Sequence, residues 1–258
     1  MDHTNSIRQE IESGGVVLGA ETATFSPSVV EVYGDVGLDF VWLDFEHAGP
    51  SPYDSTVLEN LTRAAELAGI ELLVRLPTGE PPLIRKVLDA GVRSILIPRV
   101  ETAAEVRTAV EATRYRYEGG VGDRGVGNSR NSTWGNSEPN QVELEDDSVA
   151  IGVMIENETA IENLESILAV PELDFVFVGP ADLSVSLGGS WLDPPPELDE
   201  RVDYVVETAA DAGMPVGGVA TSVSSAQAAV DRGYQVLLVG GELSSARSVL
   251  GEKLASLR

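Results

Sequence analysis

The sequence predicts a single (β/α)8 (TIM) barrel over residues 1–258, and three observations support this prediction. The chain has 258 residues, 43% of them apolar, which is the usual size of one such barrel. Short β-rich apolar runs alternate with longer stretches at helical period, as in the βα units of a parallel sheet. There are eight runs, and eight strands close a barrel. We also expect a helix before the first strand and another after the last.

The eight expected strands follow one another at intervals that leave room for a helix between them. They are VVLGAET (residues 16–22), DFVWLDFE (39–46), ELLVRLP (71–77), SILIPRV (94–100), IGVMIEN (151–157), DFVFVGPAD (174–182), PVGGVAT (215–221) and QVLLVGG (235–241). Glycine suits the left-handed position that terminates a helix. Four of the predicted helices end in such a residue just before the next strand, at Gly69, Gly91, Gly213 and Gly233.

Two irregular stretches interrupt the alternation. The fourth and fifth runs are about fifty residues apart; residues 101–115 favour a helix, and the rest is rich in Gly, Asn and Ser. We expect this rest to form a functional loop on the C-terminal side of the barrel, ordered by Arg124, Arg130 and Trp134. A disordered surface insertion is the alternative. Residues 186–200 also follow a strand end, which predicts a second rim loop.

The charge balance restricts the partners of the protein. Against 42 acidic residues stand 17 basic ones, giving a formal net charge of −25. Such a field repels nucleic acid and anionic membranes, so we expect neither as a partner. Only Lys86 and Lys253 are lysines, a composition that resembles the proteins of salt-loving organisms. Molar salt shortens the screening length to about 3 Å and relieves the self-repulsion of such a surface. The alternative is an ordinary acidic protein.

Signals for secretion or membrane insertion are missing from the sequence. Residues 1–15 lack the basic start and apolar run of a signal peptide, and no later run reaches membrane-spanning length. The chain contains no cysteine, which removes disulfides, thiolate metal sites and cysteine nucleophiles. Because neither a signal peptide nor a membrane span is found, we expect a cytoplasmic protein.

Polar residues collect at the C-terminal ends of the expected strands. In a barrel these ends surround the active-site mouth, whichever strand they come from. The residues at these positions are Asp44, Glu46, His47, Arg75, Arg99, Glu156 and Asp182.

Glu156 and Asp182 end two neighbouring apolar strands. Burying two carboxylates together is costly unless a cation or a proton offsets their charge. Hard oxygen ligands in a chain without cysteine favour Mg2+ or Mn2+, with Co2+ as a further candidate. The alternative is that each carboxylate separately pairs with an arginine or caps a helix.

His47 is the only histidine apart from His3. It follows a strand directly, and Asp44 is close enough in sequence to hold its imidazole in one tautomer for general acid–base catalysis. A purely structural histidine is the alternative. Arg75 lies within an apolar strand and needs an anion there, either Glu46 or Glu156 or a carboxylate or enolate oxygen of a substrate.

A covalent Schiff-base mechanism has no suitable lysine. Such a mechanism needs a buried lysine in the barrel mouth. Lys86 falls in the middle of an expected outer helix, and Lys253 lies near the C-terminus. Lysine-dependent aldol chemistry is therefore excluded.

These residues resemble those of the metal-dependent pyruvate aldolases typified by 4-hydroxy-2-oxoheptanedioate aldolase and 2-dehydro-3-deoxyglucarate aldolase. The resemblance covers nearly the whole chain. Its segments are LDFEH (residues 43–47), VRLP (74–77), VLDAGVRSILIPRVETAAE (87–105), ATRYRYEGGVGDRGVG (112–127), MIENETAIENL (154–164) and VFVGPADLSVSLG (176–188). Two residues depart from the family pattern. Met154 stands where those aldolases usually carry glutamine, and Phe45 replaces a small residue and is expected to reshape the pocket floor.

The resemblance implies a carbon–carbon lyase with a phosphoenolpyruvate/pyruvate-type barrel, often a hexamer with exchanged C-terminal helices. Its reaction would be the reversible cleavage of a 4-hydroxy-2-oxo acid to pyruvate and an aldehyde. Glu156 and Asp182 would hold the metal, which together with Arg75 would stabilise the pyruvate enolate. His47, oriented by Asp44, would be the acid–base residue.

The resemblance also implies a seat for the substrate. Backbone groups of Gly179, Pro180 and Ala181 would receive the pyruvate carboxylate, and Glu46 would lie beside the substrate. Two alternatives stay open. One is an acyl-CoA lyase of the citrate or malyl-CoA lyase type, which needs a basic groove for the nucleotide. The other is a non-catalytic barrel that serves as a binding module.

Overall fold

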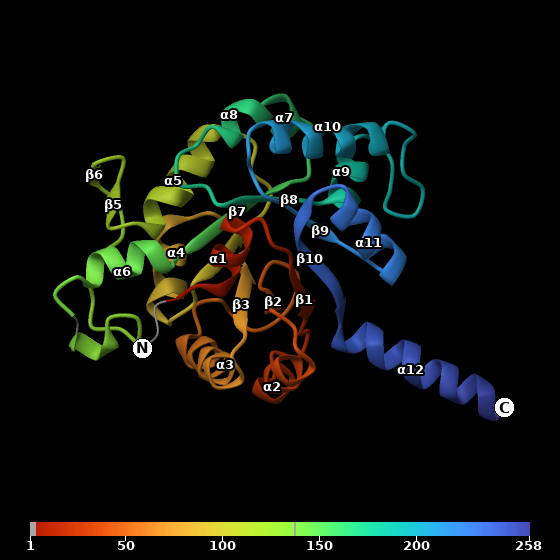
Figure 1. The fold of residues 1–258 in the computed structure, drawn as a ribbon, viewed down its shortest axis with the longest axis horizontal. Coiled ribbons are helices and arrows are strands. Elements are labelled where there is room, and N and C mark those ends of the chain that lie inside the picture. Colours follow the sequence, from red (N-terminus) through yellow and green to blue (C-terminus); the bar gives the residue numbers. More distant parts are fainter. Residues whose placement is uncertain (1–3, 137) are drawn as a thin grey trace.

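A computed structural model describes residues 4–136 and 138–258 and contains the predicted closed barrel (Figure 1). Its parallel strands neighbour one another in the order β1-β10-β9-β8-β7-β4-β3-β2. Their bounds are β1 (Val17–Glu21), β2 (Phe40–Asp44), β3 (Glu71–Arg75), β4 (Ser94–Ile97), β7 (Ala150–Ile155), β8 (Phe175–Val178), β9 (Val216–Val219) and β10 (Tyr234–Gly241). Each predicted apolar run overlaps one of these strands, so the predicted α/β barrel is confirmed.

Helices precede or follow the strands, and most of them surround the barrel on its outside (Figure 1). They are α1 (Ser6–Glu12), α2 (Pro27–Val36), α3 (Ser55–Ala68), α4 (Pro81–Asp89), α5 (Ala103–Thr113), α6 (Gln141–Ser148), α7 (Glu158–Glu162), α8 (Leu164–Leu168), α9 (Pro180–Ser186), α10 (Leu198–Asp211), α11 (Val223–Asp231) and α12 (Glu242–Leu257). The predicted terminating glycines Gly69, Gly91, Gly213 and Gly233 all have positive φ, between 65° and 99°. These positions favour glycine because a Cβ atom is strained there.

Apolar side chains form two layers, one on each side of the barrel strands. One cluster lies inside the strands and includes Phe40, Trp42, Leu73, Met154 and Phe177. A larger cluster lies between the outer faces of the strands and the helices. Because successive strand residues alternate between these layers, the register fixes which residue at each strand end faces the mouth.

The long interval before β7 lies at the opposite end of the barrel from the mouth. It follows the helix α5, and contains the hairpin β5 (Arg116–Tyr117) and β6 (Gly120–Val121) and the 3-10 turn η1 (Thr133–Gly135). The prediction of a rim loop is therefore wrong, because a helix returns the chain to the N-terminal ends of the strands. The segment is nevertheless held in place by an arginine, as predicted. Arg124 pairs with Glu145 at 2.9 Å, and both side chains are buried.

Further contacts attach this interval to the helix ends beside it. Arg130 forms an ion pair with Glu66 near the end of α3, and the hydroxyl of Ser129 donates to Asp89 at the end of α4. Trp134, which we expected to help order the segment, is 58% exposed. The arginines therefore order the segment, and the tryptophan does not.

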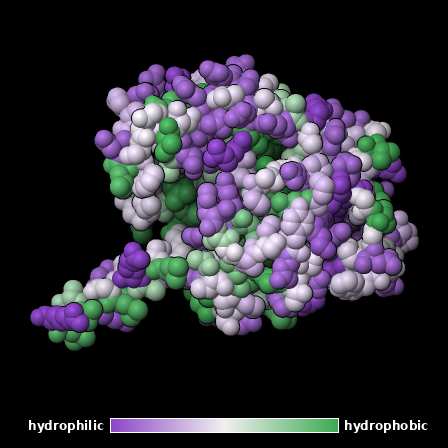
Figure 2. Space-filling model, turned by 180° about the vertical axis from the view of Figure 1, so that it is seen from behind, coloured by the Kyte–Doolittle hydropathy of each residue, from purple (hydrophilic) through white to green (hydrophobic). Residues whose placement is uncertain are grey.

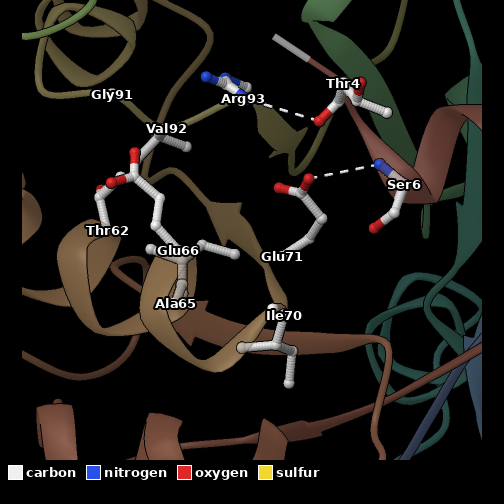
Figure 3. Close-up of a pocket in the computed structure, with 12 residues that line it drawn as sticks. Thr4, Ser6, Thr62, Ala65, Glu66, Ile70, Glu71, Gly91, Val92 and Arg93 are labelled. Atoms are coloured by element: carbon white, nitrogen blue, oxygen red, sulfur yellow. Dashed lines mark hydrogen bonds between the residues drawn. The ribbon is translucent and has the colours of Figure 1, made fainter. Parts of the chain in front are cut away.

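A cavity of about 430 Å3 lies at this same N-terminal end (Figure 3). Thr4 and Ser6, the first residue of α1, line one side of it: Glu71 accepts a hydrogen bond from the Ser6 N–H at 3.3 Å, and Arg93 donates to the Thr4 carbonyl at 3.4 Å (Figure 3). In barrels of this kind the N-terminal end supports stability, whereas the chemistry takes place at the other end.

Residues 187–197 form the loop between α9 and α10. Since α10 leads back to the start of β9, this loop lies on the mouth side, as predicted. Trp191 and Leu192 are exposed on it.

The last helix, α12, points away from the barrel and buries none of its residues (Figure 1). Apolar side chains lie along the projecting helix (Figure 2). Its exposed large apolar residues are Leu243, Val249, Leu250, Leu254 and Leu257. Within the residues that the structure describes, no helix is long and apolar enough to cross a membrane.

Candidate active site

Arg75 is fixed at the centre of the mouth. Its Nε donates to Asp44 Oδ1 at 2.9 Å and its Nη2 to Asp44 Oδ2 at 2.6 Å, a bidentate pair between neighbouring strands. The guanidinium also lies 5.5 Å from the centre of the Trp42 ring. Of the expected partners, Glu46 is further away, at 3.4 Å from Nη1. Asp44 is thus the main partner of Arg75, and the forked contact fixes the plane of the guanidinium.

The expected side-chain pair of Asp44 and His47 is absent, and this prediction is wrong. The Asp44 carboxylate receives Arg75 and the backbone N–H groups of Glu46 and His47, at 3.0 and 3.3 Å. Burial alone would raise the pKa of Asp44, but the bonds and charge of Arg75 and these two N–H groups hold it below its ordinary value. Asp44 therefore orients the chain that carries His47 and does not touch the imidazole.

Glu46 is the carboxylate that lies beside the imidazole. Its Oε2 is 3.5 Å from His47 Nε2, and the His47 side chain is 61% exposed. Burial raises the pKa of Glu46, together with the charges of Asp44 and Asp182 and against those of Arg75 and His47. A solvent-accessible imidazole next to a carboxylate can accept and return protons.

Glu156 is the buried carboxylate of the site, with 3% of its surface exposed. Its Oε1 accepts a hydrogen bond of 2.7 Å from the backbone N–H of Arg99, whose φ of 55° is unusual for a residue with a side chain. Burial raises the pKa of Glu156 to about 7; the Arg99 N–H opposes this rise, and the charges of Asp182 and Glu46 add to it. The ionised form of Glu156 is therefore unfavourable at this position.

The donor set around Glu156 fits a divalent cation. Asp182 is exposed in the first turn of α9, and its charge acts on both Glu156 and Glu46. Mutually repelling carboxylates with hard oxygen donors gain most from a cation such as Mg2+ or Mn2+. Among the described residues no three or more His, Asp or Glu side chains form a ready metal cage. Water or substrate would have to supply the other ligands.

The turn between β8 and α9 leaves space for the Glu156 side chain. A Cβ atom on Gly179 would lie 2.7 Å from Glu156 Oε2 and 2.8 Å from its Cβ. Pro180 begins α9 and has no N–H, whereas the N–H groups of Ala181 and Asp182 belong to the first turn. Such groups have no acceptor within their helix. They are suited to an anionic oxygen.

Met154 and Phe45, the two departures from the family pattern, lie in different layers. Met154 is buried inside the barrel, and its sulfur is 3.8 Å from Nη1 of Arg75. Phe45 packs outside the strands, with its ring 4.8 Å from that of Phe25. The expectation that Phe45 reshapes the pocket floor is therefore wrong, since its side chain points away from the mouth.

Two acidic residues at strand ends escaped the sequence reading. Glu21 is the last residue of β1, and Glu242 directly follows β10. Both occupy the kind of position that singled out the other candidates, so the same rule, applied to the first and last strands, would have found them. The Glu242 carboxylate binds the N–H of Thr24 at 2.6 Å and the hydroxyl of Thr22 at 3.3 Å.

Comparison with known proteins gives the same picture over the whole chain. A 5-keto-4-deoxy-D-glucarate aldolase of Klebsiella pneumoniae is 34% identical over 97% of this chain and 95% of its own. A hydroxypyruvate/pyruvate aldolase of Cupriavidus necator is 32% identical over 100% and 94%. A solved HpcH/HpaI aldolase/citrate lyase family protein of Burkholderia cenocepacia superposes with a TM-score of 0.91 at 30% identity, covering 99% of this chain and 100% of the other.

Residues 22–248 match the family described as HpcH/HpaI aldolase/citrate lyase. The match spans every strand from β2 to β10 and all the site residues described above except Glu21. The predicted likeness to pyruvate aldolases and the predicted class of carbon–carbon lyase are thereby confirmed. The chain belongs to the HpcH/HpaI aldolase/citrate lyase family.

Proposed function

We propose that the chain, acting as one catalytic domain, reversibly cleaves a 4-hydroxy-2-oxo acid to pyruvate and an aldehyde. The observation that supports this most is the placement of Arg75, fixed by Asp44, near the buried carboxylate of Glu156. The Arg75 guanidinium can bind a negatively charged oxygen, and the Glu156 carboxylate can bind a cation, within the same mouth. The aldolase names of the relatives agree with this substrate class.

Glu156 and Asp182 would hold the divalent cation, Mg2+, Mn2+ or Co2+. When bound, it would act as a Lewis acid toward the keto group of the substrate. Arg75 donates hydrogen bonds to the oxygen on which negative charge develops, in an orientation that its contact with Asp44 fixes beforehand. The N–H groups of Ala181 and Asp182 receive the carboxylate of the 2-oxo acid.

His47 removes the proton of the 4-hydroxyl group in cleavage and returns it in condensation. Glu46 lies beside the imidazole, with its Oε2 3.5 Å from His47 Nε2, and can accept a hydrogen bond from the ring. Glu46 also borders the space that the substrate occupies. The backbone contacts from Asp44 keep this loop in place.

The charges around the mouth do not favour the alternative of an acyl-CoA lyase. A coenzyme A ester carries a polyanionic nucleotide and would need a basic groove. The strand ends instead carry the carboxylates Glu21, Asp44, Glu46, Glu156, Asp182 and Glu242, whereas the arginines described there are Arg75 and Arg99.

The test is pyruvate release from a panel of 2-oxo-3-deoxy acids, measured with and without Mg2+ or Mn2+. We expect release to depend on the cation and Glu156→Ala to abolish both release and cation binding. His47→Ala should lose roughly 10²- to 10⁴-fold in cleavage while still binding the cation. A wild-type protein that releases no pyruvate from any acid, with or without a cation, would contradict the proposal.

We further propose that the protein is a homo-oligomer, most simply the hexamer of its resemblance, in which α12 packs on another copy. Leu18 of β1 is 38% exposed, and Val32 and Val36 of α2 are also exposed. In a complete barrel a helix covers such outward strand residues. The uncovered face and the apolar side of α12 are chemically matched.

A further inference from the structure

Glu21 is an acidic residue of the mouth to which the proposed mechanism gives no role. In the register it pairs with Trp42, a member of the cluster inside the barrel. Two residues earlier on the same strand, a Cβ atom on Gly19 would meet the ring of Phe40, also inside the barrel. Because strand residues alternate, the side chain of Glu21 faces the interior at the C-terminal end of β1, on the mouth side of the barrel.

The backbone of Glu21 is held firmly, while its carboxylate is left without a protein partner. The Tyr33 hydroxyl donates to the Glu21 carbonyl at 2.8 Å, and the N–H of Thr22 donates to Trp42 at 3.1 Å. Among the described residues no hydrogen bond or ion pair reaches the carboxylate. Burial raises its pKa, with the charge of Asp44 adding to this effect and that of Arg75 opposing it.

A partly buried carboxylate without a partner loses solvation and gains nothing from the protein in return. Such a group is compensated when a ligand supplies hydrogen-bond donors. A carboxylate accepts from hydroxyl groups and repels other carboxylates. Arg75 and Asp44 already satisfy each other, which leaves Glu21 free to contact the part of the substrate beyond pyruvate.

We propose that the Glu21 carboxylate binds hydroxyl groups of the aldehyde half of the substrate and selects an uncharged, hydroxylated aldehyde over an anionic or apolar one. This assignment rests on the proposed aldol reaction. It names a residue that determines which aldehyde is accepted, and leaves the binding of pyruvate to the groups described above.

The experiment measures condensation of pyruvate with three aldehydes: glyceraldehyde, propionaldehyde and succinic semialdehyde. In Glu21→Ala, kcat/KM for glyceraldehyde should fall about 10- to 100-fold, because a hydrogen bond to a charged group is lost. The value for propionaldehyde and the KM for pyruvate should stay within about threefold of wild type, the scatter expected where no contact with substrate is lost. Glu21→Gln should lose less with glyceraldehyde and should gain activity with succinic semialdehyde.

The control is Glu31→Gln, the same change of charge on the exposed side of α2. We expect it to leave all three aldehydes unchanged. An equal fall for glyceraldehyde and propionaldehyde in Glu21→Ala would indicate a structural role and overturn the assignment.

Exchange of pyruvate methyl protons with deuterated water separates the two proposals, since it needs no aldehyde. If the wild type shows no exchange, the aldol reaction fails and the role of Glu21 fails with it. If exchange is normal in wild type and Glu21→Ala but aldehyde preference does not change, only the role of Glu21 is overturned.

Discussion

The carboxyl group of Glu156 makes the stability of the folded protein depend on pH. Its pKa is raised from 4.5 to about 7, first by burial and then by the charges of Asp182 and Glu46. Below pH 4.5 the group is protonated in both the folded and unfolded states, so its contribution to stability is fully present. As the pH rises toward 7, the unfolded chain releases its proton first. The folded state then loses about 3 kcal/mol of relative stability.

We therefore expect the Tm of chelated protein to fall between pH 4.5 and 7 through this group, and added Mn2+ to restore it above pH 7. Thermal melts across this range, with chelator and with Mn2+, measure the effect. Glu156→Gln cannot titrate at this position, so the difference between wild type and variant isolates the contribution. Identical pH profiles for the two proteins would contradict the expectation.

Individual contacts in the mouth could not be predicted as well as the residues that make them. The rule that strand ends face the mouth found Asp44, Arg75 and Glu156, because it depends only on chain order. It could not decide which carboxylate binds Arg75, since several lie within reach and the choice depends on side-chain length and hydrogen-bond angles. For the same reason the imidazole of His47 was assigned the wrong neighbour.

The turn from β8 into α9 shows how an element junction controls a side chain on another strand. A methyl group at Gly179 would overlap Glu156, at 2.7 Å from Oε2. We expect Gly179→Ala to displace this carboxylate and to lower the affinity for Mn2+ about 10- to 100-fold, while the barrel still folds. Mn2+ titration by calorimetry, with circular dichroism for the fold, measures both properties.

Gly125→Ala is the matched control, since a Cβ atom there would meet nothing within 4 Å. It should bind Mn2+ like wild type. If Gly179→Ala binds the cation normally, the space beside Gly179 does not matter for the site.

The strands and helices could be predicted from the sequence more readily than the path of the long segment between β4 and β7. Parallel strands covered on both faces give continuous apolar runs, which made all eight visible. Terminating glycines marked the helix ends. The segment that contains Arg124 and Arg130 was predicted at the wrong end of the barrel, because it was assigned to the C-terminal side of the strand before it although the expected helix over residues 101–115 separates the two. One helix reverses the direction of the chain and changes the face on which a loop emerges.

The net charge of −25 predicts a strong dependence of the whole molecule on salt. Repulsion among surface carboxylates opposes compact folding, and ions screen it. We expect the Tm to be clearly higher in molar NaCl than in dilute buffer. Differential scanning fluorimetry over a series of salt concentrations is sufficient, and a Tm that does not change with salt would contradict the prediction.

Assembly through α12 can be tested with two substitutions on its apolar side. Leu250→Asp with Leu254→Asp should release smaller species, because charged groups cannot be buried on another copy without a partner. Ser248→Asp, exposed on the same helix, is the control and should leave the assembly intact. Light scattering after size-exclusion chromatography measures the mass. An unchanged mass in the double variant would exclude α12 as the contact.

The exposed strand residue Leu18 has a consequence for how the protein behaves on dilution. If only another copy can cover this face, part of the barrel's stability comes from a bimolecular step. The melting temperature would then rise with protein concentration, and a freshly made chain would finish packing only after meeting a second one. Subunits already joined would exchange slowly, because each exchange requires a helix to leave its neighbour.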